Sequence, residues 1–184
     1  IKYNTKETTS ILLTCDSPIC TTKNTLKQSS LSSPENAYAV YTYESDAEVE
    51  WISSINNGIY DIYGWFPYSS DNVDYLCVDI KNGNNIWSRN VDVKNKLNCD
   101  KWKLIATINK SDEDLIINCR NYIYFASGAF RCSAFKIEPS TNKVSTFVEY
   151  KKIITRTKGI YTNQVGYDTD KPKRFTAPNI SDGT

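Results

Sequence analysis

Histidine is absent from the 184-residue sequence, and so is methionine. Without histidine the chain has no Ser-His-Asp or Cys-His catalytic arrangement, no imidazole ligand for zinc and no side chain that ordinarily titrates near neutral pH. Most familiar hydrolase designs are therefore excluded. We find no motif that supplies catalysis by another route, so the sequence favours a binding protein over an enzyme and predicts no catalytic residue, no cofactor and no metal.

A dominant charge and long apolar runs are also lacking. Lys and Arg number 22 against 21 Asp and Glu, which gives a formal net charge of +1. Such a balance produces no strong field to attract nucleic acid or acidic lipid. No run approaches the roughly 18 consecutive apolar residues of a membrane-spanning helix. We expect neither nucleic-acid binding nor membrane insertion, and we expect a secretory leader, if the protein has one, to lie outside this sequence.

Glycine and proline are sparse, whereas aromatic residues are common. The sequence has 7 Gly and 6 Pro but 13 Tyr, 6 Phe and 4 Trp, and 40% of its residues are hydrophobic. That is too much apolar surface for a disordered chain. From residue 38 onward, short runs alternate aromatic or β-branched residues with polar ones, and turn residues separate them. The pattern predicts an all-β fold, an antiparallel β-sandwich of about ten or eleven strands.

Two glycine-containing segments predict β-hairpins. Residues 56–58 (Asn-Asn-Gly) separate two strand-like runs and give the strongest hairpin signal, and residues 81–84 (Lys-Asn-Gly-Asn) repeat the pattern. Helical periodicity is weak throughout, so we expect at most one short helix, within residues 32–39 or 149–155.

Composition divides the chain into three regions. Residues 1–36 are rich in Thr, Ser and Lys and predict an N-terminal arm packed on the domain, with one strand at 11–15. Residues 37–168 form the predicted β-sandwich binding domain. Residues 169–184 are polar and predict a flexible tail or linker stump. Trypsin-like proteases are expected to cut this tail after Lys171, Lys173 and Arg174.

Six cysteines make an even count, as expected for up to three disulfides in an oxidising compartment. The first two close a short loop, but the pairing is otherwise open. Reduced, buried thiols are the alternative, since cysteine also behaves as a small hydrophobic residue. Zinc binding is not expected without tight CxxC pairs. The disulfide candidates are Cys15, Cys20, Cys77, Cys99, Cys119 and Cys132.

Aromatic residues close to amides and hydroxyls provide a candidate binding site. Rings stack on the apolar faces of sugars, while amides and hydroxyls bond to sugar hydroxyls. We assign Trp51 and Trp102 to the core instead. The alternative of a sugar hydrolase requires two carboxylates across a cleft, for which Asp71, Asp74 and Asp79 are the candidates. The candidate glycan-binding residues are Tyr161, Thr162, Asn163, Tyr167, Trp65 and Tyr68.

Several segments follow one another in a familiar order. Over about residues 38–168 the chain resembles the head domain of the rotavirus outer-capsid spike. The resemblance implies a galectin-like sandwich that binds host cell-surface glycans at the virion outer capsid surface and is joined to the remainder of the spike. The matching segments are residues 50–52 (Glu-Trp-Ile), 59–64 (Ile-Tyr-Asp-Ile-Tyr-Gly), 101–105 (Lys-Trp-Lys-Leu-Ile), 133–136 (Ser-Ala-Phe-Lys), 142–144 (Asn-Lys-Val), 159–162 (Gly-Ile-Tyr-Thr) and 166–168 (Gly-Tyr-Asp).

One position departs from the family pattern. Well-studied members place an Arg that contacts sialic acid directly before the strand Trp, whereas Glu50 precedes Trp51 here. A carboxylate repels an acidic sugar, so we do not expect a sialic acid site of that design. Tyr161 and Thr162 match another part of the same pocket, which leaves a neutral glycan open as the ligand. The six cysteines imply a divergent rotavirus group. The alternative hypothesis is a secreted, extracellular, disulfide-stabilised β-sandwich that binds a host protein.

Overall fold

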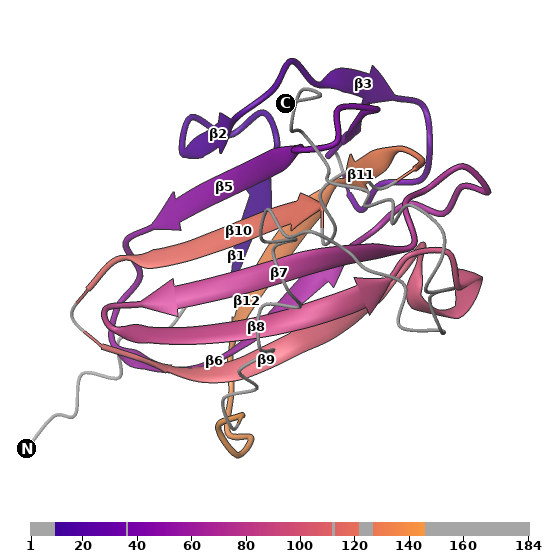
Figure 1. Ribbon diagram of the computed structural model, residues 1–184. Coiled ribbons are helices and arrows are strands. Elements are labelled where there is room, and N and C mark those ends of the chain that lie inside the picture. The colour runs from indigo at the N-terminus through magenta and orange to yellow at the C-terminus, as the bar shows by residue number, and fades with distance from the viewer. Residues whose placement is uncertain (1–9, 36, 112, 122–126, 146–184) are drawn as a thin grey trace, which may run out of the picture. The chain divides into compact units, whose positions relative to one another are not determined.

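The computed structural model describes residues 10–145, except 36, 112 and 122–126. These residues form three sheets, and all strand pairs within them are antiparallel (Figure 1). The expectation of an all-β antiparallel sandwich is confirmed.

The two larger sheets form the layers of the sandwich, and a smaller sheet lies beside them. In spatial order, the four-stranded sheet contains β1 (Ile11–Thr14), β12 (Ala134–Pro139), β6 (Gly58–Trp65) and β9 (Trp102–Lys110). The five-stranded sheet contains β2 (Cys20–Thr22), β5 (Glu48–Ser53), β10 (Leu115–Asn121), β7 (Tyr75–Asn82) and β8 (Asn85–Asp92). The three-stranded sheet contains β11 (Phe130–Cys132), β4 (Ala39–Thr42) and β3 (Lys27–Ser29).

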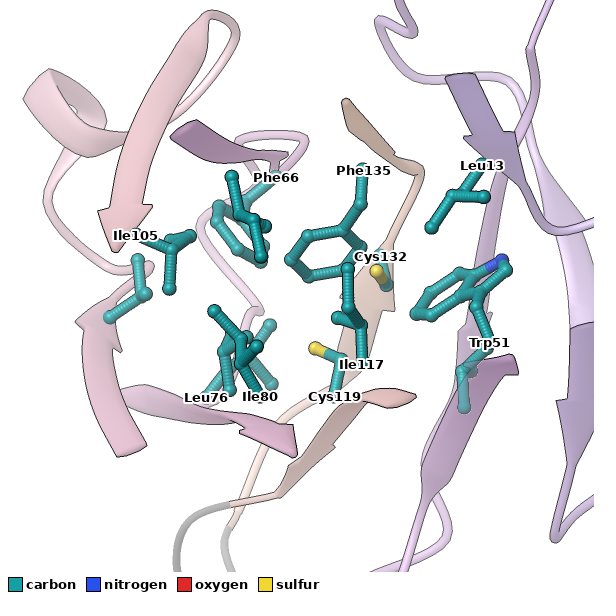
Figure 2. Close-up of a cluster of buried hydrophobic side chains, with 14 of the residues drawn as sticks. Leu13, Trp51, Phe66, Leu76, Ile80, Ile105, Ile117, Cys119, Cys132 and Phe135 are labelled. Carbon is teal, nitrogen blue, oxygen red and sulfur yellow. The ribbon is translucent and has the colours of Figure 1, made fainter. Parts of the chain in front are cut away.

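The core lies between the two larger sheets. Phe135 of β12 meets the ring of Trp51 on β5 edge-on, with centroids 5.1 Å apart, and the ring of Phe66 at 6.0 Å (Figure 2). All three rings have 0% exposure. The assignment of Trp51 to the core is therefore confirmed. Burial of these rings from both layers is what holds the sheets face to face.

The two predicted hairpins have different outcomes. Residues 81–84 do connect the antiparallel pair β7 and β8, and Gly83 has the left-handed φ of +58° that such a turn requires. Residues 56–58 do not form a hairpin, because β5 and β6 belong to different sheets. Trp51 of β5 and Ile62 of β6 both point into the shared core. The chain therefore crosses from one layer to the other at this turn instead of pairing with itself.

Helical structure is minimal in the described part of the chain. It comprises one 3₁₀ turn, η1 (Lys96–Asn98), whose first turn is capped by the Asn95 side chain. The helix expected within residues 32–39 is wrong for the described positions there, and residues 149–155 lie outside them. Among described residues, no helix has the length and apolar character needed to cross a membrane.

The predicted N-terminal arm contributes strands to all three sheets. The strand expected at 11–15 is present as β1, and the arm also supplies β2 and β3. The domain limits proposed from composition stay predictions. Their C-terminal part, including the tail residues 169–184 with Lys171, Lys173 and Arg174, lies outside the described residues.

Candidate functional site

The structure describes two of the six predicted binding residues. Trp65 is the last residue of β6, and Tyr68 follows it closely in the connection to β7. The other four lie outside the described residues, so their role in binding stays a prediction. They are Tyr161, Thr162, Asn163 and Tyr167.

Aromatic side chains share the outer face of the four-stranded sheet. Tyr63 and Trp65 are two residues apart on β6, so both point to the same side of the sheet. Trp102 of β9 pairs with Trp65, and Lys136 of β12 pairs with Tyr63. Each of these four residues is half-buried. We call this set (Tyr63, Trp65, Trp102 and Lys136) the aromatic face.

Direct contacts fix the rings of the aromatic face. Trp65 and Trp102 meet edge to face, with ring centroids 5.6 Å apart. The Lys136 ammonium lies 5.3 Å from the ring centre of Tyr63 and 5.0 Å from that of Trp102, within the range of a cation–π interaction. Its Nζ also lies 2.9 Å from Oε1 of Glu138. The lysine therefore joins two of the rings, and the carboxylate offsets its charge.

Buried polar groups anchor the Tyr63 hydroxyl. It donates to Oδ2 of Asp61 at 3.5 Å. Asp61 is buried and accepts further bonds from Oγ1 of Thr107 at 2.6 Å and Nδ2 of Asn142 at 2.7 Å. Burial and the charge of Asp61 raise the pKa of Tyr63, so its phenol stays protonated at neutral pH.

Trp65 and Tyr68 have separate surroundings. The indole Nε1 of Trp65 donates to the backbone carbonyl of Ser32 at 3.2 Å, which ties the ring to the N-terminal region. The Tyr68 backbone N–H donates to Oδ1 of Asp100 at 3.0 Å, and Lys96 Nζ lies 5.7 Å from its ring centre. Tyr68 also packs against the core. Of these two predicted residues, Trp65 is the one on the aromatic face.

The sequence pattern did not predict three members of the aromatic face. Its assignment of Trp102 to the core is wrong, because this side chain is half-buried on the outer surface of the sheet. The alternation of Tyr63 and Trp65 with buried Gly64 was a usable signal, since alternate strand residues share a face. Lys136 carried no such signal, because its place depends on the pairing of β12 with β6.

A polar groove of about 670 Å³ lies beside the N-terminal strands. The side-chain amide of Asn24 donates to Oδ1 of Asp46 at 2.9 Å, and Lys23 pairs with the other oxygen of that carboxylate at 2.9 Å. The side-chain carbonyl oxygen of Asn24 is buried and has no hydrogen-bond partner among the described residues. The residues that line the groove are Cys15, Thr22, Lys23, Asn24, Thr25, Leu26, Gln28, Tyr38 and Val40.

The candidate hydrolase carboxylates have structural contacts of their own. Asp71 pairs with Arg131 at 2.7 Å, and Asp79 of β7 pairs with Arg120 of β10 at 3.1 Å. The two carboxylates therefore belong to separate ion pairs. In the ranges that the structure describes, no group of three or more Cys, Asp or Glu residues is arranged to hold a metal ion.

Glu50, which departs from the spike-head pattern, is remote from the aromatic face. It lies on β5, in the five-stranded sheet, where its Oε2 accepts from Nδ2 of Asn118 at 3.4 Å. The same amide donates to Oε1 of Glu48 at 2.6 Å. The acidic pair therefore holds a neighbouring strand, β10, and the Trp51 ring beside it points into the core.

The arrangement defines a class of fold, an antiparallel β-sandwich with an aromatic outer face. No family model matches the chain, and no curated protein matches it. Among solved structures, a Paenibacillus xanthan lyase superposes with a TM-score of 0.63 at 16% identity, over 72% of this chain. The chain spans 13% of the length of that lyase. CBM35, a carbohydrate-binding module from Cellvibrio japonicus Abf62, superposes with a TM-score of 0.52 at 11% identity, over 76% of this chain and 100% of the module. At these identities the comparisons show a shared fold.

Proposed function

We propose that the domain binds glycans, that the aromatic face is the contact surface and that the protein catalyses no reaction. The observation that carries the proposal is the placement of three rings and one lysine in register on one outer sheet face. The similarity of the fold to that of CBM35, a carbohydrate-binding module, supports it. The shared fold is the observation, and glycan binding by this chain is what we propose from it.

The chemistry of the aromatic face suits a sugar. Rings provide flat apolar surface for the C–H faces of a pyranose. The Lys136 ammonium can donate to sugar hydroxyls, and the Tyr63 hydroxyl oxygen, whose own proton is donated to Asp61, can accept from them. The rings are held by Lys136, by each other and by Ser32, so little side-chain entropy is lost on binding. Because Glu138 offsets the charge of Lys136, we assign the face to a neutral glycan.

The biological role that we propose is host-cell attachment as the head of a viral spike. Its support is the order of sequence segments shared with the rotavirus spike head. A single site that contacts a sugar through a few side chains binds weakly, so adhesion would depend on several copies of the domain acting together. The spike context and the virion location are proposals that rest on this sequence order.

A glycan array probed with a multimerised domain tests the function. We expect binding to one class of neutral glycans. Trp102→Ala is expected to weaken that binding about tenfold or more, equivalent to about 1.4 kcal/mol for loss of one ring. Trp102→Phe should retain most of it, because a ring remains. Tyr75→Ala is the matched control, since Tyr75 is an exposed ring (42%) at the start of β7 in the other sheet.

The possible outcomes separate the function from the site. Absence of binding to every neutral and acidic glycan by a folded domain contradicts glycan recognition. Binding that survives Trp102→Ala and Trp65→Ala unchanged contradicts the aromatic face but retains the function. In that case, Tyr161→Ala and Asn163→Ala test the residues predicted from sequence, and Gln28→Ala tests the groove.

A further inference from the structure

The segment that follows β12, residues 140–145, is held against the two strands that carry the rings of the aromatic face. At its start, the Ser140 backbone N–H donates to the carbonyl of Ile59 on β6 at 2.9 Å. At its end, the Ser145 backbone N–H donates to the carbonyl of Thr107 on β9 at 2.8 Å, and the Ser145 Oγ accepts from the Thr107 N–H at 2.9 Å. Both ends of the segment are therefore fixed to the four-stranded sheet.

Asn142 is the residue of this segment whose side chain contacts the aromatic face. It is exposed, and its Nδ2 donates to Oδ2 of Asp61 at 2.7 Å. Its backbone N–H donates to Oγ of Ser140 at 3.0 Å, which fixes the turn before it. The same Asp61 oxygen accepts from the Tyr63 hydroxyl at 3.5 Å. One buried carboxylate therefore holds both the Asn142 amide and a ring of the aromatic face.

The Asn142 amide keeps hydrogen-bonding capacity after this contact. A primary amide has two N–H donors and a carbonyl oxygen with two acceptor sites. Within the described ranges, the amide makes one hydrogen bond, which uses one N–H. The other N–H and the carbonyl oxygen are left for a ligand. A donor and an acceptor on one planar group match two neighbouring hydroxyls of a pyranose, of which one accepts and the other donates.

The spacing along β6 exceeds one sugar ring. Asp61, Tyr63 and Trp65 alternate with inward residues, so all three point to the outer side of the sheet. Trp65 and Asp61 are four residues apart, which places their Cα atoms about 13 Å from each other at about 3.3 Å per residue. Tyr63 lies midway. A single pyranose therefore does not contact the two tryptophans and Asn142 at the same time.

We propose that Asn142 forms a second sugar subsite beyond the rings and that the ligand of the aromatic face is an oligosaccharide of at least two sugars. One sugar packs on Trp65 and Trp102, and a later sugar in the chain, past Tyr63, bonds to the Asn142 amide through two hydroxyls. Asp61, which is 6% exposed, is a positioning residue that orients the amide. This inference rests on the proposed glycan-binding function and adds the length and direction of the ligand.

The second subsite adds affinity at small entropic cost. The Asn142 side chain is already held by Asp61, and its backbone is held by the Ser140 hydroxyl, so little freedom is lost when a sugar binds. A sugar that is linked to the one on the rings also loses little further freedom, because it is already tethered to the site. Affinity should therefore rise with the length of the oligosaccharide.

Nuclear magnetic resonance titration tests the subsite. The ¹⁵N-labelled chain is titrated with the monosaccharide and the trisaccharide of the neutral glycan that the array selects. We expect the indole N–H signals of Trp65 and Trp102 to shift with both sugars and the side-chain amide signals of Asn142 to shift with the trisaccharide. The trisaccharide should bind at least ten times more tightly. Unshifted Asn142 signals with the trisaccharide, or equal affinities for the two sugars, would overturn the subsite.

Asn142→Ala separates direct contact from a structural role. We expect it to weaken trisaccharide binding about tenfold and to change monosaccharide binding less than twofold. If Asn142 served only to support Tyr63, binding of both sugars would weaken alike, and the proposal would be overturned. Thr141→Ala is the matched control, because Thr141 is an exposed neighbour in the same segment, and it should leave both affinities unchanged. Near-ultraviolet circular dichroism confirms that both variants are folded.

The outcomes distinguish this inference from the proposed function. Absence of all glycan binding by the folded domain contradicts both. Trisaccharide binding that Trp102→Ala weakens and Asn142→Ala leaves unchanged retains the aromatic face and overturns only the second subsite.

Discussion

Arg131 links the connection between β6 and β7 to β11, an edge strand of the three-stranded sheet. It lies on β11 with 8% exposure, and its two terminal nitrogens donate to the Asp71 carboxylate at 2.7 and 3.1 Å. It also donates to Oδ1 of Asn72 at 2.8 Å. Asn72 is itself buried, and its amide bonds the carbonyls of Pro67 and Val93. The Arg131 guanidinium therefore holds Asp71 and Asn72, two neighbouring residues in the connection between β6 and β7.

Arg131→Ala is expected to destabilise the protein by about 2 kcal/mol, the scale for loss of charge-assisted hydrogen bonds. A larger effect is not expected, because the Asp71 side chain is 42% exposed and water solvates the carboxylate that remains. Urea denaturation measures the change. The control is Lys23→Ala, which removes an ion pair between a 53% exposed lysine and Asp46 and should lower the midpoint much less. Equal effects of the two variants would contradict this account.

Asp71 gives the same cluster a pH dependence. Hydrogen bonds from Arg131, and then from Ser69 and Tyr43, hold the pKa of Asp71 well below its usual range. Because the pKa of Asp71 is lower in the folded state than in the unfolded state, ionised Asp71 stabilises the fold. This contribution to the free energy of unfolding is fully present above the unfolded-state pKa of about 4 and is lost as pH falls through the folded-state pKa. The stability difference between wild type and Asp71→Asn should therefore be constant from about pH 5 to 8 and shrink below about pH 4. A difference that grows on acidification contradicts the assignment.

At the scale of elements, the turn between β7 and β8 depends on one backbone conformation. Gly83 has φ +58°, where a side chain costs about 1–2 kcal/mol except in Asn and Asp. A Cβ atom there would lie 3.1 Å from Cγ of Glu113, a flexible side chain that can move away. We expect Gly83→Ala to lower the free energy of unfolding by about 1 kcal/mol and Gly83→Asn by less, as measured in urea. Alanine and asparagine both place a Cβ atom near Glu113. Equal losses of free energy in the two variants would therefore assign the effect to this steric contact and not to the positive φ.

Alternation in the sequence located these strands but not their sheets. It predicted β5 and β6 correctly as strands, yet the glycine turn between them joins two layers, because both strands contribute to one core. Turn residues specify a reversal of the chain and leave the partner of each strand open. Residues 130–138 have the sequence pattern of one continuous strand, whereas a break at Ser133 divides them between two sheets. The aromatic face could not be predicted without the strand partners, because Trp65, Trp102 and Lys136 come together only through strand pairing.

At the scale of the whole molecule, β12 links the core to the candidate binding surface. Phe135 points inward and contacts Trp51 of the opposite sheet, while its neighbour Lys136 points outward to Tyr63 and Trp102. Consecutive strand residues face opposite sides of a sheet. The packing between layers therefore fixes the strand that positions Lys136 among the rings.

Phe135→Ala should cost about 3–5 kcal/mol, the usual range for removal of a fully buried phenyl ring. That is a large fraction of the roughly 5–15 kcal/mol that stabilises a typical domain. We expect a strongly lowered urea midpoint, with far-ultraviolet circular dichroism and tryptophan fluorescence changing together, because both sheets share one core. Leu97→Ala, at a side chain that is 75% exposed on η1, is the control and should leave the midpoint unchanged. If the two signals separate in the wild type, the sheets unfold independently, and Phe135 cannot be the contact that makes the aromatic face depend on the core.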